Sequence, residues 1–359
     1  MQKKIIALAI AAAFAAPVAM AETANVVIYG VASVSADSVY GASATGAAEQ
    51  RDRISSNNSY IGFKGSEDLG DGVSAVWQYE TQIAFDRQDI NNTGATASTG
   101  GQSKRNTFAG LSSKSLGTLT FGVQDTPLKT STAPVAQFVN TLADPRAVFT
   151  LASVRAENSA LYVSPNMGGF VASALYSSMN EAGNGNVDNP SLYSVSGSYT
   201  DGPIYAVLAY EKSTAYTGTV ESNTKTSRAG FGYTFGDAKV GLAYEKNKTE
   251  VAGAADTLDA SAWYVSGAYK MGSNTLKASY TKRSANSANA IGNDGASQTS
   301  IGVDHAMSKR TTIYALYTTT RNDTNGTYSV AGGSSGIAQV PSATGDNASG
   351  VSLGMVHSF

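Results

Sequence analysis

Residues 351–359, V-S-L-G-M-V-H-S-F, end the chain and carry the pattern that decides its fold. Apolar or aromatic side chains occupy alternate positions, namely Val351, Leu353, Met355, His357 and Phe359. A period of two predicts a β-strand with one apolar face. Chain ends usually fray, so a strand that continues to the last residue must be held by a neighbouring strand.

The same alternation recurs upstream in segments of about 8 to 12 residues, the length of a tilted membrane-spanning strand. In residues 192–200, Tyr193 and Tyr199 share one face, and Ser and Thr occupy the other. Residues 73–82 and 228–235 repeat the pattern. A soluble sandwich would carry charged side chains on its second face, whereas these segments carry mainly small polar ones. We therefore expect the apolar face to meet lipid and the polar face to line an aqueous lumen.

Connections and aromatic residues support a membrane barrel. Tyrosines toward the segment ends suit a membrane interface: Tyr199, Tyr210, Tyr233, Tyr244, Tyr269 and Tyr280. Tight turns rich in Gly, Pro, Asp and Asn are expected at seven places: 69–72, 115–117, 165–169, 201–203, 236–237, 271–274 and 306–310. Longer polar stretches are expected at eight: 36–58, 86–103, 125–158, 178–190, 212–226, 247–260, 282–296 and 320–348.

Fifteen connections predict an all-β fold, a 16-stranded antiparallel transmembrane β-barrel. An even strand number with short turns on one side and long loops on the other is the plan of a bacterial outer-membrane barrel. Closure leaves no sheet edge exposed to lipid. A barrel of this size leaves room for an aqueous channel.

The beginning of the chain predicts export. Lys3 and Lys4 precede an apolar run and a small-residue site before Glu22, which is typical of a signal peptide. We expect residues 1–21 to be cleaved and residues 22–359 to form a single barrel domain. Losing the two lysines changes the formal charge from −2 to −4, so nucleic acid is an unfavourable partner. The absence of cysteine from the sequence excludes disulfides and thiolate metal sites, and no cofactor is expected.

Several runs resemble the Gram-negative general porin family of Neisseria and betaproteobacteria. The V-I-Y-G opening at residues 27–30 and the terminal Phe359 match that family. The longer matches are Y-I-G-F-K-G-S-E-D-L-G-D-G (60–72), R-N-T-F-A-G-L-S-S (105–113), L-T-F-G-V-Q-D-T-P (119–127) and E-N-S-A-L-Y-V-S-P-N (157–166).

The resemblance implies a homotrimer of barrels in the outer membrane, each with its third loop folded inward, that passes small hydrophilic solutes and ions by passive diffusion. Outer-membrane lipid and lipopolysaccharide would surround it. The resemblance also implies that Phe359 is an assembly signal read by the barrel assembly machinery during biogenesis.

The candidate pore residues are the charges of the third loop and of the early strands. The loop, about 125–158, is the longest connection and carries bulky apolar residues that must pack against something. Opposed charges across a narrow pore create a transverse field that biases ions. The proposed pore constriction contains Lys64, Glu80, Arg105, Asp125, Lys129, Asp144, Arg146, Arg155 and Glu157.

Three positions depart from the family. Relatives often carry a basic residue where this chain has Tyr60, Val123 and Leu161. The strong anion preference of some relatives therefore does not transfer, and the sequence predicts weak selectivity without fixing its sign.

Two alternative functions remain open. A substrate-specific channel would share the same barrel and differ in loop conformation. An outer-membrane barrel enzyme would need a nucleophile and a base on adjacent strands. Residues 332–336 match G-x-S-x-G, but they lie in a Gly/Ser stretch without the strand-turn-helix context of a nucleophile elbow. His305 and His357 lack metal-ligand spacing, so the sequence favours a non-enzymatic channel.

Overall fold

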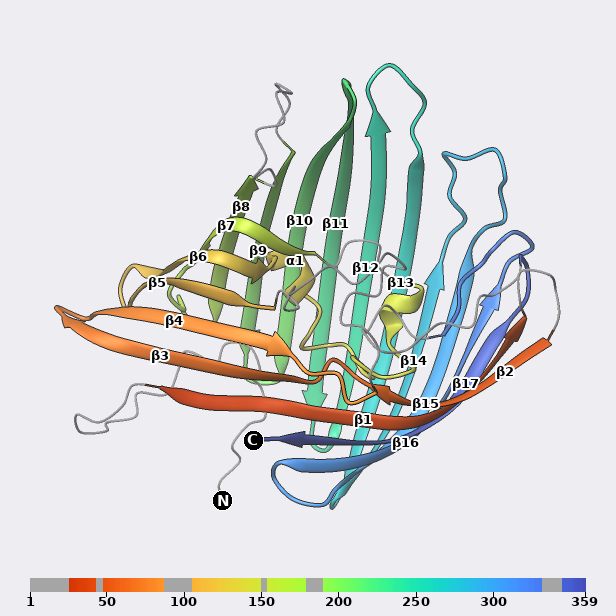
Figure 1. The fold of residues 1–359 in the computed structure, drawn as a ribbon, viewed down its shortest axis with the longest axis horizontal. Helices are drawn as coiled ribbons and strands as arrows, with labels where there is room; N and C mark the ends of the chain where they lie inside the picture. The colour runs from red at the N-terminus through yellow and green to blue at the C-terminus, as the bar shows by residue number, and fades with distance from the viewer. Residues whose placement is uncertain (1–25, 43–47, 87–104, 150–153, 179–189, 331–343) are drawn as a thin grey trace.

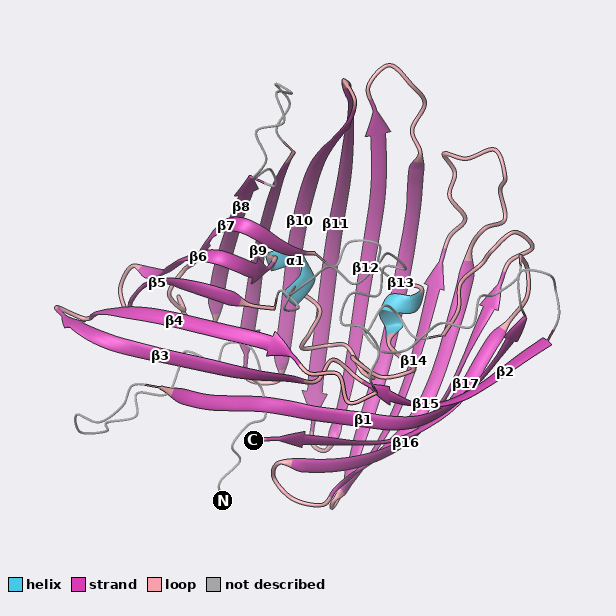
Figure 2. Ribbon diagram, viewed as in Figure 1, coloured by secondary structure: helices cyan, strands magenta, loops and turns pink. Residues whose placement is uncertain are grey.

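The computed structural model describes residues 26–42, 48–86, 105–149, 154–178, 190–330 and 344–359. The predicted signal peptide, residues 1–21, lies outside the described residues, as do residues 87–103 of the predicted second long loop. The described residues form seventeen strands and two short helices (Figures 1 and 2).

The strands follow one another along a single antiparallel sheet. Their bounds are β1 (Val27–Ala42), β2 (Ala48–Ser56), β3 (Tyr60–Gly70), β4 (Val73–Gln82), β5 (Thr107–Ser113), β6 (Gly117–Asp125), β7 (Arg155–Val163), β8 (Phe170–Ser178), β9 (Ser191–Asp201), β10 (Ile204–Thr217), β11 (Val220–Phe235), β12 (Ala238–Val251), β13 (Leu258–Met271), β14 (Asn274–Arg283), β15 (Ala296–Ala306), β16 (Thr311–Asn322) and β17 (Ala348–Ser358). The helices are α1 (Pro127–Thr130) and the 3-10 helix η2 (Pro145–Ala147), both between β6 and β7. Neither of these approaches the length of a membrane-spanning helix.

β2 and β3 are two halves of one barrel strand. β1 pairs with β2 along one half of its length and with β3 along the other, from Val34↔Ser56 and Val31↔Tyr60 respectively. Residues 57–59 interrupt the strand, and Asn58 adopts a positive φ of 59° there. Counted in this way, the described residues make sixteen barrel strands, which confirms the strand number predicted from the connections.

Pairing of β1 with β17 closes the barrel. The register runs from Val31↔Ser358 to Tyr40↔Ser349. Beyond it, the Gly30 N–H donates to the Phe359 carbonyl at 3.0 Å, and the Phe359 N–H donates to the Gly30 carbonyl at 3.1 Å. The last residue is therefore held by the first strand, which answers how an amphipathic strand can continue to the end of the chain.

The two faces of the wall differ as the alternation predicts. In β17, Leu353 is 65 % exposed on the outside, while its neighbour Ser352 is fully buried on the inside. In β13, Trp263 is 59 % exposed and Tyr264 is 2 % exposed. Large apolar side chains thus lie on the outer surface, the reverse of a soluble protein, and the outer wall suits contact with hydrocarbon.

The seven predicted tight turns are confirmed, but three predicted long loops are wrong. β1 and β2 extend through most of residues 36–58, β10 and β11 turn only at residues 218–219, and β12 and β13 leave residues 252–257 between them. β10 to β13 extend further upward than β14 to β17 (Figure 1), and strand ends that leave the membrane meet water on both faces. Alternation is lost there, and polar pairs such as Thr224–Thr249 at 2.9 Å join the strands instead.

Candidate functional site: the lumen at the third loop

The third loop, between β6 and β7, lies inside the barrel rather than over its mouth (Figures 1 and 2). Pro127 begins α1, and the Thr126 hydroxyl caps this helix by accepting the Lys129 N–H at 3.2 Å. The Leu128 N–H then donates to Ser194 Oγ of β9 at 3.1 Å. These contacts turn the chain into the lumen directly after β6 ends.

A buried ion pair holds the start of the loop. Arg228 of β11 donates from Nη1 to the Leu128 carbonyl at 2.6 Å and from Nε to Glu245 of β12 at 2.9 Å. The Arg228 and Glu245 side chains are 2 % and 0 % exposed. A charge buried in this way is stabilised only while its partner is present, so the loop and the two strands are coupled at this point.

The middle of the loop is fixed to β12 and β13. Ser266 donates to the Val135 carbonyl at 2.7 Å, and the Gln137 N–H donates to the Tyr264 hydroxyl at 2.7 Å. A Cβ on Gly241 would lie 2.5 Å from the Val135 carbonyl. Glycine on the inner face of β12 therefore allows the loop backbone to lie against the wall.

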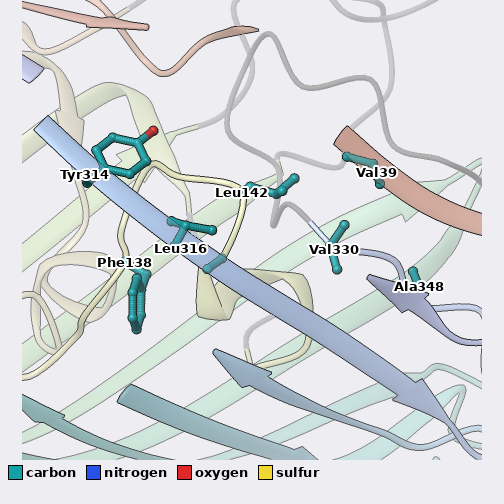
Figure 3. Close-up of a cluster of buried hydrophobic side chains, with 8 residues drawn as sticks. Val39, Phe138, Leu142, Tyr314, Leu316, Val330 and Ala348 are labelled. Carbon is teal, nitrogen blue, oxygen red and sulfur yellow. The ribbon is translucent and has the colours of Figure 1, made fainter. Parts of the chain in front are cut away.

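The far part of the loop packs on the other side of the lumen (Figure 3). Phe138 and Leu142 are 3 % and 0 % exposed, in one cluster with Tyr314 and Leu316 of β16. Other members of the cluster are Val39, Ala143, Val330 and Ala348. The loop thus crosses the lumen from β9–β11 to β1, β16 and β17, which confirms that the third loop folds inward.

The early-strand candidates form a wall cluster of Lys64, Glu80 and Arg105. Arg105 Nε lies 3.3 Å from Glu80 Oε2. The Arg105 guanidinium also lies over the Tyr60 ring, 4.1 Å from its centroid. Lys64 Nζ lies 4.9 Å from the centroid of Tyr29, whose hydroxyl donates to Glu80 at 2.8 Å. The structure brings these three charges together on β3, β4 and the segment before β5.

Asp125 joins two cations at the root of the loop. Its Oδ1 lies 2.7 Å from Lys129 Nζ and 3.0 Å from Arg155 Nε. Asn106 donates to Asp125 Oδ2 at 3.2 Å. Burial lowers the pKa of Lys129 below its usual value, although the Asp125 charge opposes this shift. Opposite charges at close range keep each other ionised in a narrow polar space.

Asp144 and Arg146 pair within the loop itself. Asp144 caps η2 by accepting the Arg146 N–H at 2.9 Å, and Arg146 Nε donates to the same carboxylate at 2.8 Å. Burial acts to lower the pKa of Arg146, but the Asp144 carboxylate outweighs it and raises that pKa above its usual value. Asn140 accepts a further hydrogen bond from Arg146 at 2.8 Å, so this guanidinium is held in one orientation.

Glu157, the ninth candidate, follows Arg155 by two positions. It lies on β7, where its carbonyl accepts a hydrogen bond from Ser177 Oγ at 2.5 Å. The other eight candidates comprise five cations and three carboxylates, and with Glu157 the nine carry an excess of one positive charge.

Sequence reasoning missed the residues that hold these charges in place. Tyr29 and Tyr60 support the wall cluster, and Arg228 and Glu245 anchor the loop. A signal was available: Gly241, which leaves room for Val135, is a glycine at a lumen-facing strand position. Such a glycine marks a place where another backbone approaches closely.

A closed barrel with an apolar outer wall, a polar inner wall and a charged loop inside the lumen defines a membrane channel protein. The model of a protein family described as Gram-negative porin matches residues 7–325 of the chain. The chain belongs to this family and is an outer-membrane porin.

Individual relatives agree over different extents. The chain is 27 % identical to outer membrane porin protein 32 of Delftia acidovorans, with 100 % of both chains covered. It is 27 % identical over 206 residues to an outer membrane porin protein of Bordetella pertussis, covering 53 % of this chain and about half, 52 %, of that protein.

Solved structures share the fold. An anion-selective porin from Comamonas acidovorans superposes with a TM-score of 0.77 at 22 % identity, covering 93 % of this chain and 99 % of that one. The trimer form of OmpT from Vibrio cholerae gives a TM-score of 0.66 at 17 % identity, covering 93 % and 99 %.

Proposed function

We propose that the barrel passes small hydrophilic solutes and ions by passive diffusion, and that the third loop forms its constriction. The observation that carries the proposal is the position of the eight clustered charges beside a loop that crosses the lumen. Fixed charges of both signs in a narrow aqueous path orient dipolar solutes and bias ions. Because most of these charges lie beside an opposite charge, the field is local and no single solute is bound tightly.

The excess of one positive charge among the nine candidates supports a weak preference for anions. It is too small to exclude cations, because water in the pore screens each charge. The test is planar-bilayer conductance of the purified protein, with the reversal potential measured under a salt gradient. We expect open channels and a small shift toward the anion equilibrium potential. A silent bilayer would refute the channel, and a shift of the opposite sign would refute the anion preference.

A substrate-specific channel is the second candidate, and it predicts saturable conductance with blockade by one solute. An enzyme is not favoured, because the described residues contain no group of three His, Asp or Glu that could hold a metal ion. His305 Nδ1 contacts an amide oxygen, Asn274 Oδ1, at 2.8 Å, and His357 Nδ1 contacts the Thr311 hydroxyl at 2.9 Å at the end of the last strand rather than in the lumen. Hydrolysis of chromogenic esters that disappears on substitution of His305 or His357 would overturn this conclusion.

We also propose that three copies assemble through the outer face of β1, β16 and β17. Val34, Ala36, Ile313 and Leu353 line an apolar hollow on that face, whereas outward tyrosines such as Tyr193 are concentrated on β8–β14. Small apolar side chains allow two walls to approach closely, and aromatic belts suit lipid. Ala36→Trp should lower the trimer fraction in mild detergent, while Ala172→Trp on β8 should not.

The proposal also includes the route by which the protein is exported. Cleavage after residue 21 would release the barrel domain into the periplasm, where the assembly machinery would insert it among lipid and lipopolysaccharide. Sequencing the N-terminus of the mature protein tests the cleavage site.

A further inference from the structure

Arg283 is a buried cation without a carboxylate partner. It is the last residue of β14 and is 2 % exposed. Within the described residues it forms no ion pair with Asp or Glu, whereas Arg228, another buried arginine of the lumen, is paired with Glu245. Burying a charge is costly unless an opposite charge and hydrogen bonds compensate for it. An uncompensated guanidinium of this kind points to an anion.

The guanidinium also has a donor without an acceptor. Arg283 Nη1 is closed to solvent and has no hydrogen-bond partner. The Tyr328 ring lies over the guanidinium, with 5.8 Å between Arg283 Cζ and the ring centroid. A ring face attracts a cation, but it does not neutralise the charge.

Acidic residues in the adjoining connections are engaged elsewhere. Asp323 Oδ1 lies 3.6 Å from Lys282 Nζ, and Asp294 Oδ2 accepts a hydrogen bond from Asn289 at 2.9 Å. Neither carboxylate forms an ion pair with Arg283. The charge of this guanidinium is therefore not balanced by the two loops that adjoin it.

Two more donors lie beside Arg283 on the inner wall. Thr281 is two positions earlier on the same face of β14, and Gln298 of β15 is directly opposite Thr281. Their side chains are 1 % and 2 % exposed, and Thr281 Oγ1 and Gln298 Nε2 have no hydrogen-bond partner. Three adjacent cases are unusual, because the great majority of buried polar side chains find a partner.

Small and aromatic residues surround these donors. The cross-strand neighbours of Arg283 are Ala262 of β13 and Ala296 of β15, so no side chain longer than a methyl group stands beside it on either strand. Phe149 of the third loop packs in one cluster with Ala262. The donors therefore face methyl groups and aromatic rings rather than other polar groups.

The donors adjoin both of the loops that enter the lumen. Tyr264, directly opposite Thr281, accepts a backbone N–H of the third loop at 2.7 Å. On the other side, Thr320 of β16 is opposite Gln298 and donates to the Ser329 carbonyl at 3.1 Å. A solute that passes the third loop therefore passes this part of the wall.

The chemistry of the donors favours a small monocarboxylate. A guanidinium, an amide N–H and a hydroxyl can share the two oxygens of one carboxylate, and the planar guanidinium matches that geometry. Lys282, the neighbour of Arg283 in sequence, points to the opposite face of β14. One positive charge balances a carboxylate, whereas a phosphate near neutral pH carries more negative charge than that. Methyl groups and rings suit a short hydrocarbon chain.

We propose that Thr281, Arg283 and Gln298 form a binding site for small monocarboxylates. The carboxylate accepts from Arg283 Nη1 and Gln298 Nε2, and its hydrocarbon part lies against the alanine methyls. The Tyr328 ring turns aside as the solute enters. Binding is weak, because a solute in a channel must also leave. The inference goes beyond the proposed diffusion channel and rests on it only for access of the solute to the lumen.

The test measures binding of butyrate to the purified protein in detergent by saturation-transfer NMR. Butyramide has the same shape without the charge, so we expect it to bind more weakly than butyrate. In Arg283→Gln the half-saturating butyrate concentration should rise about ten-fold, because a charge-assisted hydrogen bond is lost. Arg283→Lys keeps the charge without the planar fork and should give an intermediate value. Equimolar inorganic phosphate should not displace butyrate.

The matched control is Arg53→Gln. Arg53 is a partly buried arginine on another part of the inner wall, opposite Asp37 of β1, and its loss should leave butyrate binding unchanged. Equal binding of butyrate by wild type and Arg283→Gln, or equal weakening in the control, would overturn the site. Displacement by equimolar phosphate, or equal binding of butyrate and butyramide to wild type, would also overturn it.

Folding and conduction are measured separately. No carboxylate loses its partner in Arg283→Gln, so this variant should keep the thermal stability of the wild type. If it does not fold, the comparison of butyrate with butyramide on wild type decides the proposal. A silent planar bilayer together with intact butyrate binding would refute the diffusion channel and support the site. Open channels without butyrate binding would refute only the site.

Discussion

The buried pair of Arg228 and Glu245 is the residue-scale contact on which the third loop depends most. Arg228→Met leaves Glu245 buried without its cation and removes the hydrogen bond to Leu128. Breaking one partner of a buried pair costs about 3–5 kcal/mol. We expect the free energy of unfolding, measured by urea titration in detergent, to fall by about that amount.

The control for this prediction is Arg310→Met, in the exposed turn between β15 and β16. Arg310 should be replaceable with a change below about 0.5 kcal/mol, as is usual for surface sites. If the Arg228→Met protein keeps the stability of the wild type, and its single-channel conductance is unchanged and no noisier, the loop does not need this anchor.

Asp125 sets the local charge at the root of the loop. Asp125→Asn removes the carboxylate shared by Lys129 and Arg155, so the excess positive charge beside the loop increases by one. We expect the anion-to-cation permeability ratio to rise about five-fold, since a unit charge several Å from an ion in water contributes about 0.5 kcal/mol, with opposite sign for the anion and the cation. Reversal potentials under a salt gradient measure this ratio.

Two further variants make that prediction specific. Arg155→Gln should shift the reversal potential in the opposite direction, and Asp201→Asn, at the exposed end of β9 and remote from the loop, should leave it unchanged. The same shift from Asp201→Asn would mean that total charge, rather than position, sets selectivity.

At the residue scale, alternation alone placed Lys64 and Glu80 on the lumen side, and the structure puts them in one cluster. Alternation could not reveal the roles of Tyr29, Tyr60 or Arg228, because these roles depend on partners that are distant along the chain. Tyr29 and Glu80, for example, are separated by 51 positions. A pattern of period two fixes the face of a side chain and says nothing about what lies opposite.

At the element scale, the third loop is the feature whose removal has the clearest consequence. Deleting residues 134–150 removes Phe138 and Leu142 from the far wall and the Asp144–Arg146 pair from the lumen. We expect single-channel conductance to rise about two-fold, in proportion to the widened aqueous path.

The control deletion shortens the hairpin between β12 and β13 by removing residues 252–257. This connection lies outside the lumen at the tip of two extended strands (Figure 1), so conductance should not change. Equal conductance in wild type and in the 134–150 deletion would mean that the loop is not the constriction.

The elements themselves were predictable where one face meets lipid. The seven short turns and the strands between them follow from alternation and turn residues. Strand ends above the membrane were not predictable, because water on both faces removes the selection for apolar residues at every second position. The segment 212–226 looks like a loop for that reason, yet Lys212↔Lys225 and Thr217↔Val220 pair within a continuous hairpin.

At the scale of the whole molecule, closure depends on the first and last strands finding each other. No local pattern specifies that pairing: β1 and β17 are separated by the entire barrel, and their register spans ten residue pairs from Val31↔Ser358 to Tyr40↔Ser349. Closure is necessary because an open edge would leave backbone groups unpaired in lipid, and the even number of barrel strands lets the first and last strands pair antiparallel.

Phe359 combines closure with a proposed role in assembly, and the two can be separated. Its backbone pairs with Gly30, and its ring lies over that residue, where a Cβ on Gly30 would come within 2.5 Å of the ring. Phe359→Ser keeps the backbone pairing but removes the ring. We expect a lower yield of folded protein in the outer membrane, while the barrels that do assemble keep nearly normal thermal stability, because only terminal contacts are lost.

The measurement is the folded fraction seen as heat-modifiable mobility on gels of outer-membrane extracts. Met355→Ser, on the same outward face but inside the strand, serves as the control and should lower stability more than yield. If both variants reduce yield and stability equally, Phe359 acts only through packing and carries no assembly signal.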